Sequence, residues 1–236
     1  MASEVFDLIT IGRVSVDIYP LQTGVPLPQV QTFQKFLGGS ATNVACAAAK
    51  YGLKSAVITR TGNDPFGDYI HQELRHLGVS DRFVSGVPDL LTPIVFCEIF
   101  PPDNFPLYFY RLPKAPDLVI NPSELDLDTI KNAKIYWSTV TGLCQEPSRT
   151  AHHVAWDARA KKQFTVLDLD YRPMFWSSAE EASAEVSKAL SKVSVAVGNL
   201  EECQVAVGES EPHRAADALL ERGVELAVVK MGPKGV

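Results

Sequence analysis

Short apolar runs rich in β-branched residues alternate along the chain with longer amphipathic stretches. The runs are typical of strands buried on both faces, and the stretches are typical of helices that cover a sheet. The pattern predicts strands at 5–12, 55–60, 134–139, 164–170, 193–198 and 225–230. It predicts helices at 40–51, 66–77, 122–132, 147–162, 178–191, 200–207 and 212–222. Because strand and helix alternate, we expect an α/β fold with a mostly parallel sheet and helices on both faces.

Two segments, 13–37 and 92–111, contain strand-like residues and prolines but no helical pattern. The second is typical of a hairpin around the sequence PPDNFP. Strands of this kind do not easily join a parallel core, so we expect a small separate β-sheet that forms a lid over one edge of it. The apolar face of such a lid needs a cover. A second copy of the lid would provide one, which predicts a homodimer.

The length of 236 residues suits one large α/β domain, and we expect residues 1–236 to form one. The last predicted strand runs directly into MGPKGV, with no later strand or helix to cover it. A compact domain rarely stops at such a point. We therefore expect the chain to be the front part of a longer α/β protein, with the fold incomplete at its C-terminus.

Composition and charge narrow the class of partner. No apolar run approaches the ~20 residues that a membrane span needs. The net charge is −6 and no basic stripe is visible, which argues against a nucleic-acid partner. The four cysteines form no CxxC pair, and the start MASEVFDLITIG has no basic segment before an apolar one. These features favour free thiols and a cytoplasmic location. The five histidines show no metal-binding spacing, and we expect them on helix surfaces.

The stretch FLGGSATNVACAAAKYG, residues 36–52, places two glycines directly before an alanine-rich helix. Gly38 and Gly39 allow the backbone to approach a ligand closely, and Ser40 is suited to capping the helix. Asn43 offers a donor and an acceptor to a polyol hydroxyl. The alternative is a capped helix that packs tightly on the sheet through its alanines. Local physics leaves the two interpretations equal.

The stretch VLDLDYRPMFW places Asp168, Asp170 and Arg172 in alternation, so a strand would direct all three to one side. Pro173 cannot continue a central strand, so the charges fall where the strand should end. Ligands of open parallel sheets bind beyond the carboxyl ends of the strands. Arg172 there is suited to a two-pronged contact with a carboxylate. A structural Asp–Arg pair is the alternative.

The stretch GNLEEC follows another predicted strand and places Asn199 and Glu202 on one face of a helix. These side chains could reach Mg²⁺ or steady a triphosphate, or they could form a capping box. In VKMGPKG, Lys230 and Gly232 end the last strand in a turn whose amides could face a phosphate.

Three further residues belong to the predicted lid. Asp17 follows the first strand and is suited to accept hydrogen bonds from sugar hydroxyls; a turn-forming aspartate is the alternative. Tyr110 and Arg111 end the lid hairpin and would bring a positive charge over the pocket. Simple surface exposure is the alternative for these two.

With these motifs in place, the chain resembles the PfkB, or ribokinase-like, carbohydrate kinases over essentially its whole length. The motifs that carry the resemblance are LGGSATNVACAAAKYG and TRTGNDPFGDYIHQELRHLGV. Within that family, the stretches TIGRVSVDIYP, YRLPKAPDL and LDLDYRPMFW resemble most the 5-dehydro-2-deoxygluconokinases of inositol breakdown. The 2-keto-3-deoxygluconate kinases come next.

The resemblance implies a Rossmann-like core with a β lid that often pairs into a dimer. It implies transfer of phosphate from Mg²⁺-bound ATP to the primary hydroxyl of a sugar acid, most specifically 5-dehydro-2-deoxy-D-gluconate. By matching motif positions, the substrate would be held by Asp17, Gly38, Gly39, Asn43, Tyr110, Arg111, Asp170 and Arg172. Arg111 and Arg172 would meet the carboxylate. Asn199, Lys230 and Gly232 would lie at the nucleotide, and Glu202 would organise the metal.

One family motif is absent from the printed sequence: the Gly-Ala-Gly-Asp run that supplies an anion hole and the catalytic aspartate. Phosphoryl transfer needs a positioned base, so we expect no catalytic base within these residues and little turnover by this chain alone. The alternatives within enzymes are a 2-keto-3-deoxygluconate kinase and a fructokinase. The alternative of another class is a non-catalytic sugar-binding or truncated member of the family.

Overall fold

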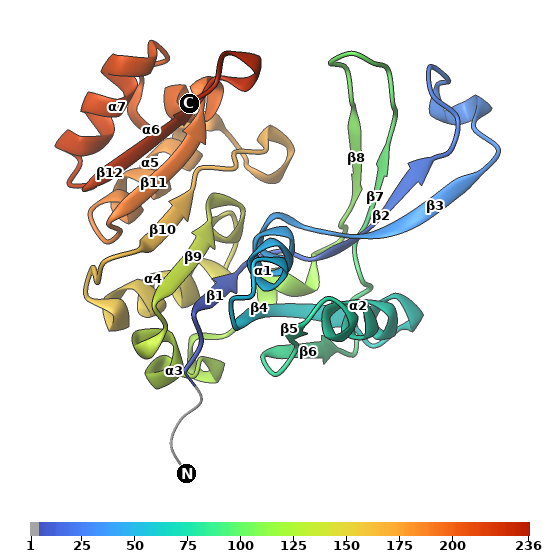
Figure 1. Cartoon of the computed structure of the whole chain (residues 1–236), viewed down its shortest axis with the longest axis horizontal. Helices are drawn as coiled ribbons and strands as arrows, with labels where there is room; N and C mark the ends of the chain where they lie inside the picture. Colours follow the sequence, from blue (N-terminus) through green and yellow to red (C-terminus); the bar gives the residue numbers. More distant parts are fainter. Residues whose placement is uncertain (1–4) are drawn as a thin grey trace.

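The computed structural model describes residues 5–236 and shows the predicted α/β architecture (Figure 1). Its main sheet is parallel and has the strand order β12-β11-β10-β9-β1-β4-β5, with β6 paired to β4. The strands of this sheet are β1 (Leu8–Ile11), β4 (Ser55–Gly62), β5 (Val79–Ser80), β6 (Val84–Val87), β9 (Ile135–Thr139), β10 (Thr165–Asp168), β11 (Val195–Asn199) and β12 (Leu226–Lys230).

Strand β1 lies inside the sheet and pairs with β4 on one side and β9 on the other. The chain therefore builds outward from β1 in two directions, and the strand order reverses there. Its sequence LITI is buried at every position, as expected for a strand covered on both faces. Leu8 packs into one apolar cluster, while Ile9 and Ile11 pack into the other, because neighbouring side chains point to opposite faces.

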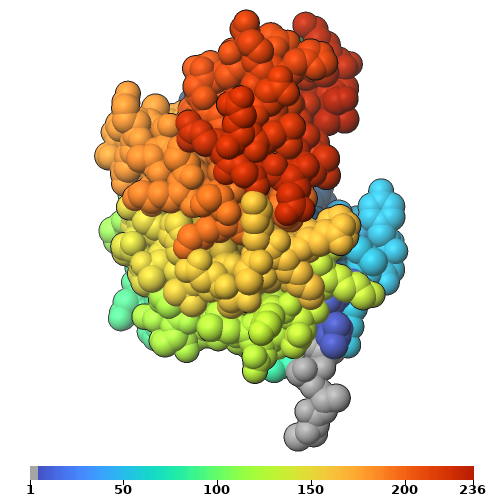
Figure 2. All heavy atoms as spheres, turned by 90° about the vertical axis from the view of Figure 1, so that its left-hand side faces the viewer, coloured from blue at the N-terminus to red at the C-terminus, as the bar shows by residue number. Residues whose placement is uncertain are grey.

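Helices cover the two faces. Ala41 and Ala45 of α1 and Ile70 of α2 belong to the same cluster as Leu8, and Trp156 of α4 belongs to the cluster on the other face. Seen from the side, segments coloured lime, yellow, orange and red follow one another in the order of β9 to β12 (Figure 2). The helices are α1 (Ser40–Lys50), α2 (Pro65–His76), α3 (Leu127–Asn132), α4 (Ser148–Arg159), α5 (Ala179–Leu190), α6 (Leu200–Val207) and α7 (Pro212–Glu221).

The predicted lid is a separate four-stranded sheet of order β3-β2-β7-β8 that projects from the core (Figure 1). Its strands are β2 (Ser15–Pro20), β3 (Phe33–Gly38), β7 (Ile94–Cys97) and β8 (Leu107–Tyr110). Strands β2 and β7 are parallel, and the two outer pairs are antiparallel. The segments 13–37 and 92–111 thus meet as expected, and β7 and β8 flank the PPDNFP turn.

The structure differs from the predicted elements in three places. The helix predicted at 122–132 is split into a short 3₁₀ turn, Pro122–Glu124, and α3, because Asp126 caps a new start. Helix α4 ends at Arg159 rather than 162, where Ala160 enters the left-handed region at φ 48°. Strands β5 and β6 were not predicted, since each is a short edge piece without a long apolar run. The first four residues of the predicted 1–236 domain lie outside the described residues.

Two expectations on composition can be compared with the structure. All four cysteines are free, and Cys97, Cys144 and Cys203 are buried, as expected. Within residues 5–236, no helix combines the length and the apolar character needed to cross a bilayer.

The placement of the histidines on helix surfaces is wrong for His152. This side chain is fully buried in α4, where its Nδ1 lies 2.8 Å from the carbonyl oxygen of Ser148. Burial lowers the pKa of His152 to about 4, with a smaller lowering from His153 and smaller opposing effects of the Ser148 hydrogen bond and Asp117. The imidazole is therefore neutral at pH 7. Its ring also fills the space beside Gly142, where an added Cβ would lie 2.2 Å from Cε1.

The burial of His152 predicts a loss of stability in acid. The folded-state pKa lies below the ordinary 6.5, so the unfolded chain binds more protons and stability falls as the pH drops from about 6.5 towards 4. The loss attributable to this group is about 3 kcal/mol. Urea unfolding at pH 7 and pH 4.5 measures it. His152→Gln should remove this component of the pH dependence, whereas His213→Gln, at an exposed helical position, should retain it.

Candidate active site

The carboxyl ends of the parallel strands and the near face of the lid enclose a polar cavity of about 280 Å³. Seven of the predicted site residues line it: Asp17, Gly39, Asn43, Asp170, Arg172, Glu202 and Lys230. They come from β2, the start of α1, the segment after β10, helix α6 and the end of β12. The rule that ligands bind beyond the carboxyl ends of parallel strands thus locates the site.

The glycine pair brings the lid and the first helix close to the start of β2. An added Cβ on Gly38 would lie 2.1 Å from Oδ1 of Asp17, so the bare backbone there faces the carboxylate. Gly39 has φ 104°, and an added Cβ would lie 2.4 Å from the carbonyl oxygen of Arg13. Both positions require glycine for close approach. Helix α1 begins directly after them and presents Asn43 to the cavity.

Asp170 lies between two arginines at the base of the cavity. Its Oδ2 is 3.3 Å from Nη2 of Arg13, and its Oδ1 is 2.8 Å from Nη2 of Arg172. Burial raises the pKa of Asp170, but Arg13 and Arg172 together outweigh this effect, and the pKa lies below its ordinary value. The carboxylate is therefore ionised. The structural Asp–Arg pair, expected as the alternative, is present, and both residues also line the cavity.

A second charged group lies at the ends of β10 and β12. Nζ of Lys230 is 3.7 Å from Oδ1 of Asp168 and 3.7 Å from Oε2 of Glu202. Burial raises the pKa of Asp168 to about 6, and Asp170 and Glu202 add to the rise while Lys230 opposes it. This end of the cavity therefore carries two carboxylates and one ammonium group.

The lid contributes a carboxylate from above. Oγ of Ser15 donates a 2.7 Å hydrogen bond to Oδ1 of Asp17. Burial raises the pKa of Asp17, against smaller lowering effects of Ser15, Arg13 and Tyr19. Asp17 shares its side of the lid sheet with Val95 and Phe109, its neighbours across the ladder. These three side chains line the cavity on the lid side.

Five other predicted residues do not line the cavity: Gly38, Asn199, Gly232, Tyr110 and Arg111. Asn199 and Glu202 form a reciprocal capping box at the start of α6, as the alternative interpretation expected. Gly232 lies exposed in the turn after β12. Tyr110 is 64% exposed and points away from the cavity's lining on the lid, and Arg111 is buried elsewhere.

Arg111 is the largest departure from the predicted site. Its Nη2 is 2.9 Å from Oδ2 of Asp117, and both side chains are buried. Its guanidinium lies 4.8 Å from the ring centre of Phe175, whose ring in turn lies edge-on to Phe109 at 5.1 Å. Arg111 lines a different hollow, next to Tyr110 and Leu112, and is absent from the lining of the cavity, so the structure does not place its charge over the pocket.

Arg13 and Phe109 also line the cavity and were not predicted from the sequence. Arg13 lies two residues beyond the end of β1, at the same edge as Asp170 and Lys230, so the strand-end rule applied to the first strand would have found it. Phe109 carried no such signal, because its role depends on the register of β8 against β7.

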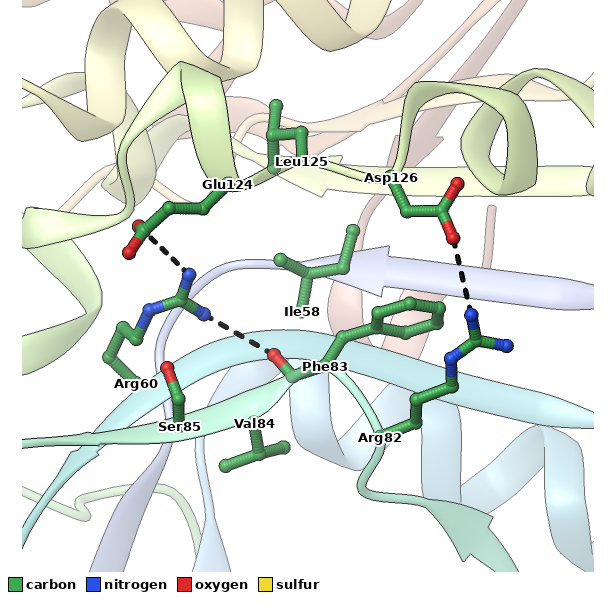
Figure 3. Close-up of a pocket in the computed structure, with 9 residues that line it drawn as sticks. All are labelled: Ile58, Arg60, Arg82, Phe83, Val84, Ser85, Glu124, Leu125 and Asp126. Atoms are coloured by element: carbon green, nitrogen blue, oxygen red, sulfur yellow. Dashed lines mark hydrogen bonds and ion pairs between the residues drawn. The ribbon is translucent and has the colours of Figure 1, made fainter.

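A different cavity, of about 250 Å³, lies between β4, β6 and the start of α3 (Figure 3). Arg60 and Glu124 form an ion pair across it at 3.0 Å, and Arg82 and Asp126 form another at 3.4 Å. Arg60 also donates a hydrogen bond to the carbonyl oxygen of Phe83. These contacts tie the edge of the sheet to the segment before β9, and none of the predicted site residues lies there.

Comparison of the sequence with known proteins shows the family to which the chain belongs. The family model described as pfkB family carbohydrate kinase matches residues 5–236 of the chain. The chain belongs to this family. It is therefore a phosphotransferase of the carbohydrate-kinase type, and its core and lid are those of a PfkB protein.

The PfkB chain is 33% identical over 236 residues to a 5-dehydro-2-deoxygluconokinase of Listeria monocytogenes, covering 98% of the chain and 72% of the relative. It is 32% identical over 234 residues to the enzyme of that name in Shouchella clausii, with the same coverage. A PfkB protein from a Polaromonas species superposes with a TM-score of 0.88 at 24% identity, over 98% of this chain and 78% of that one. A sugar kinase of Pyrococcus horikoshii in complex with ATP superposes with a TM-score of 0.78 at 24% identity, over 97% and 72%.

The residues of the PfkB cavity fit its implied cofactors in part. ATP needs cations and amides for its phosphates, and Lys230 with the turn at Gly232 can supply them. Mg²⁺ is commonly held by one or two carboxylates together with phosphates and water, which suits Asp168 and Glu202. Within residues 5–236, no group of three or more histidine, cysteine or acidic side chains could hold a metal alone.

The close approach at Gly39 predicts a strong substitution effect. Gly39→Ala adds a Cβ that overlaps the Arg13 backbone and is strained at φ 104°, so we expect a loss of about 3 kcal/mol or more in the free energy of unfolding. Gly52→Ala is the matched control, since Gly52 also has a positive φ, 82°, but open space around it. It should cost about 1 kcal/mol. Equal losses in urea unfolding would contradict the packing argument.

Proposed function

We propose that this PfkB chain binds a sugar acid for phosphorylation by ATP at a primary hydroxyl, and that the substrate is 5-dehydro-2-deoxy-D-gluconate. The observation that carries the proposal is Arg172 at the base of the cavity. Its side chain is 35% exposed, and Asp170 engages it through one terminal nitrogen. A guanidinium held on one side by a carboxylate keeps other N–H donors for a second carboxylate.

The opposite side of the cavity suits a polyol. Asp17 accepts hydrogen bonds, Asn43 both accepts and donates them, and Gly39 leaves backbone exposed beside them. Neutral sugars would use the same groups, but they have no need of Arg172. Two relatives that are 32% and 33% identical to the chain are named 5-dehydro-2-deoxygluconokinase, which supports a sugar acid as the substrate.

The nucleotide would lie at the other end, beside Lys230, Asp168 and Glu202. Glu202 is our proposed Mg²⁺ ligand, reached through water because its carboxylate already accepts a 2.7 Å hydrogen bond from the backbone N–H of Asn199. Asn199 then positions Glu202 through the capping box, and the turn at Gly232 would face the phosphates.

A second candidate substrate is 2-keto-3-deoxygluconate. A 2-dehydro-3-deoxygluconokinase of Thermotoga maritima superposes with a TM-score of 0.79, and its named substrate carries the same carboxylate. Arg172 would bind the carboxylate of either acid, so the cavity supports a sugar acid as the substrate class more strongly than it supports one of the two acids.

A panel of ligands tests this proposal. We expect calorimetry with 5-dehydro-2-deoxygluconate, 2-keto-3-deoxygluconate and D-fructose, each in the presence of Mg²⁺ and an ATP analogue, to rank the first acid highest and fructose lowest. Arg172→Gln should weaken binding of the acids by roughly ten- to a hundredfold, the value of a charged hydrogen bond, and should change fructose binding little. A preference for fructose that survives Arg172→Gln would refute the sugar-acid proposal.

We also propose that the lid pairs with a second copy of itself. The face of the lid that points away from the cavity carries a row of aromatic rings, with Phe96 5.7 Å from Phe33 and 5.5 Å from Tyr110. Phe33 and Tyr110 are exposed. An apolar row of this kind on a projecting sheet is typical of an interface.

Light scattering after size exclusion tests the pairing. We expect a dimer for the unaltered chain and a shift towards monomer for Tyr110→Lys, which places a charge in the row. Tyr51→Lys is the matched control, because Tyr51 is 89% exposed at the end of α1, and it should remain dimeric. A monomeric unaltered chain at micromolar concentration would rule the interface out.

A further inference from the structure

Arg13 is a buried arginine with no role in the polyol and nucleotide contacts proposed above. Its side chain is 9% exposed and lines the cavity beside Arg172. Of its five N–H donors, one reaches Asp170, and the buried Nε has no partner within the described residues. Burying a guanidinium with so few hydrogen bonds is costly unless a ligand supplies the missing acceptors.

The charges around Arg13 favour an anion. Asp170 is one carboxylate shared between two guanidinium groups, which leaves this base of the cavity with a net charge of +1. Asp17 faces Arg13 from the lid and offsets part of this charge, so the N–H groups of Arg13 and Arg172 that have no partner within residues 5–236 carry the case for an anion. Asp168 and Glu202 lie with Lys230 at the nucleotide end.

Aromatic contacts hold Arg13 in this place. Its guanidinium lies 5.6 Å from the ring centre of Phe109, which lies edge-on to Phe175, the ring that Arg111 contacts. Arg111 has its own buried partner in Asp117 at 2.9 Å. Of these two arginines, Arg13 is the one that lines the cavity.

We propose that Arg13, together with Arg172, forms the carboxylate subsite of the sugar acid and determines the preference for an acid over a neutral sugar. This inference rests on the proposed function. The two guanidinium groups on either side of Asp170 bind one substrate carboxylate, and Arg111 has no part in it. Arg13 is thus a specificity-determining residue, placed by β1 and by the ring of Phe109.

The test compares 5-dehydro-2-deoxy-D-gluconate with its C1 amide, which keeps the skeleton and loses the charge. Calorimetry on the full chain gives the ratio of the two association constants. Arg13→Gln should weaken acid binding at least tenfold and change amide binding less than twofold, so the ratio falls towards one. Arg13→Lys keeps the charge but not the planar fork, so it should show an intermediate ratio.

Two further variants complete the design. Arg60→Gln removes another buried, ion-paired arginine from the cavity of Figure 3 and should keep the ratio of the unaltered chain within twofold. Arg111→Gln removes an arginine that the sequence had assigned to the carboxylate, and it should also keep the ratio of the unaltered chain within twofold. Circular dichroism confirms folding, and Arg13→Lys carries the test if Arg13→Gln does not fold.

The outcomes separate the two proposals. An unaltered chain that binds acid and amide equally overturns the sugar-acid function and this inference with it. An unaltered chain that prefers the acid, with a preference that survives Arg13→Gln or collapses in Arg111→Gln, overturns the inference alone. Equal weakening of acid and amide by Arg13→Gln assigns Arg13 a general structural role and also overturns it.

Discussion

The parallel alignment of the central strands determines where charge can lie in this protein. Strands β1, β9 and β10 are covered on both faces, so a charged side chain within them would be buried without water. In these three strands charge is found only where a strand ends, and parallel strands end at one edge; Arg60, inside β4, is buried with Glu124 as its ion partner. Arg13, Asp168 and Lys230 come from three such ends, and their meeting in one cavity is a consequence of this constraint.

The lid is connected to the core at this same edge of the parallel sheet. Its first strand, β2, continues from β1 after only three residues, and its second returns through Gly38 and Gly39 into α1. The two bare residues allow β3 to pass over Asp17 and the backbone of Arg13 at a distance that no side chain would permit. Asp17 is therefore fixed above the strand ends by main-chain geometry, and a change at either glycine reaches the cavity through the backbone.

The parts of the structure that follow from local pattern were predictable from the sequence. Helix α6 has the predicted bounds, because Asn199 and Glu202 form a capping box that the sequence displays. Asp170, Arg172 and Lys230 were found by their position at strand ends. His152 could have been placed inside, since Ala151, Ala155 and Trp156 recur with it on one buried face of α4.

Other features depend on contacts between distant segments and left no local signal. Arg111 was expected over the pocket because it ends a lid strand, but it turns to a buried aspartate six residues later. Nothing in the spacing of Arg111 and Asp117 distinguishes this pair from a surface one. The contact between Phe109 and Phe175 joins β8 to the segment after β10, and strands β5 and β6 are edge pieces that only the finished sheet defines.

The division of charge within the cavity also bears on how an anionic substrate would lie. Arg13 and Arg172 flank Asp170, whereas Asp168 and Glu202 surround Lys230, and the backbone N–H of Asp170 donates to Asp168 between the two groups. A sugar carboxylate and a triphosphate repel each other, and at the effective dielectric of a partly buried site this repulsion is several kcal/mol at ~4 Å. In the proposed complex the acid group lies against the arginines and the far hydroxyl is directed towards the nucleotide. In that complex, charge would select the end of the sugar that is phosphorylated, whereas a neutral sugar would have to be oriented through hydroxyl contacts alone.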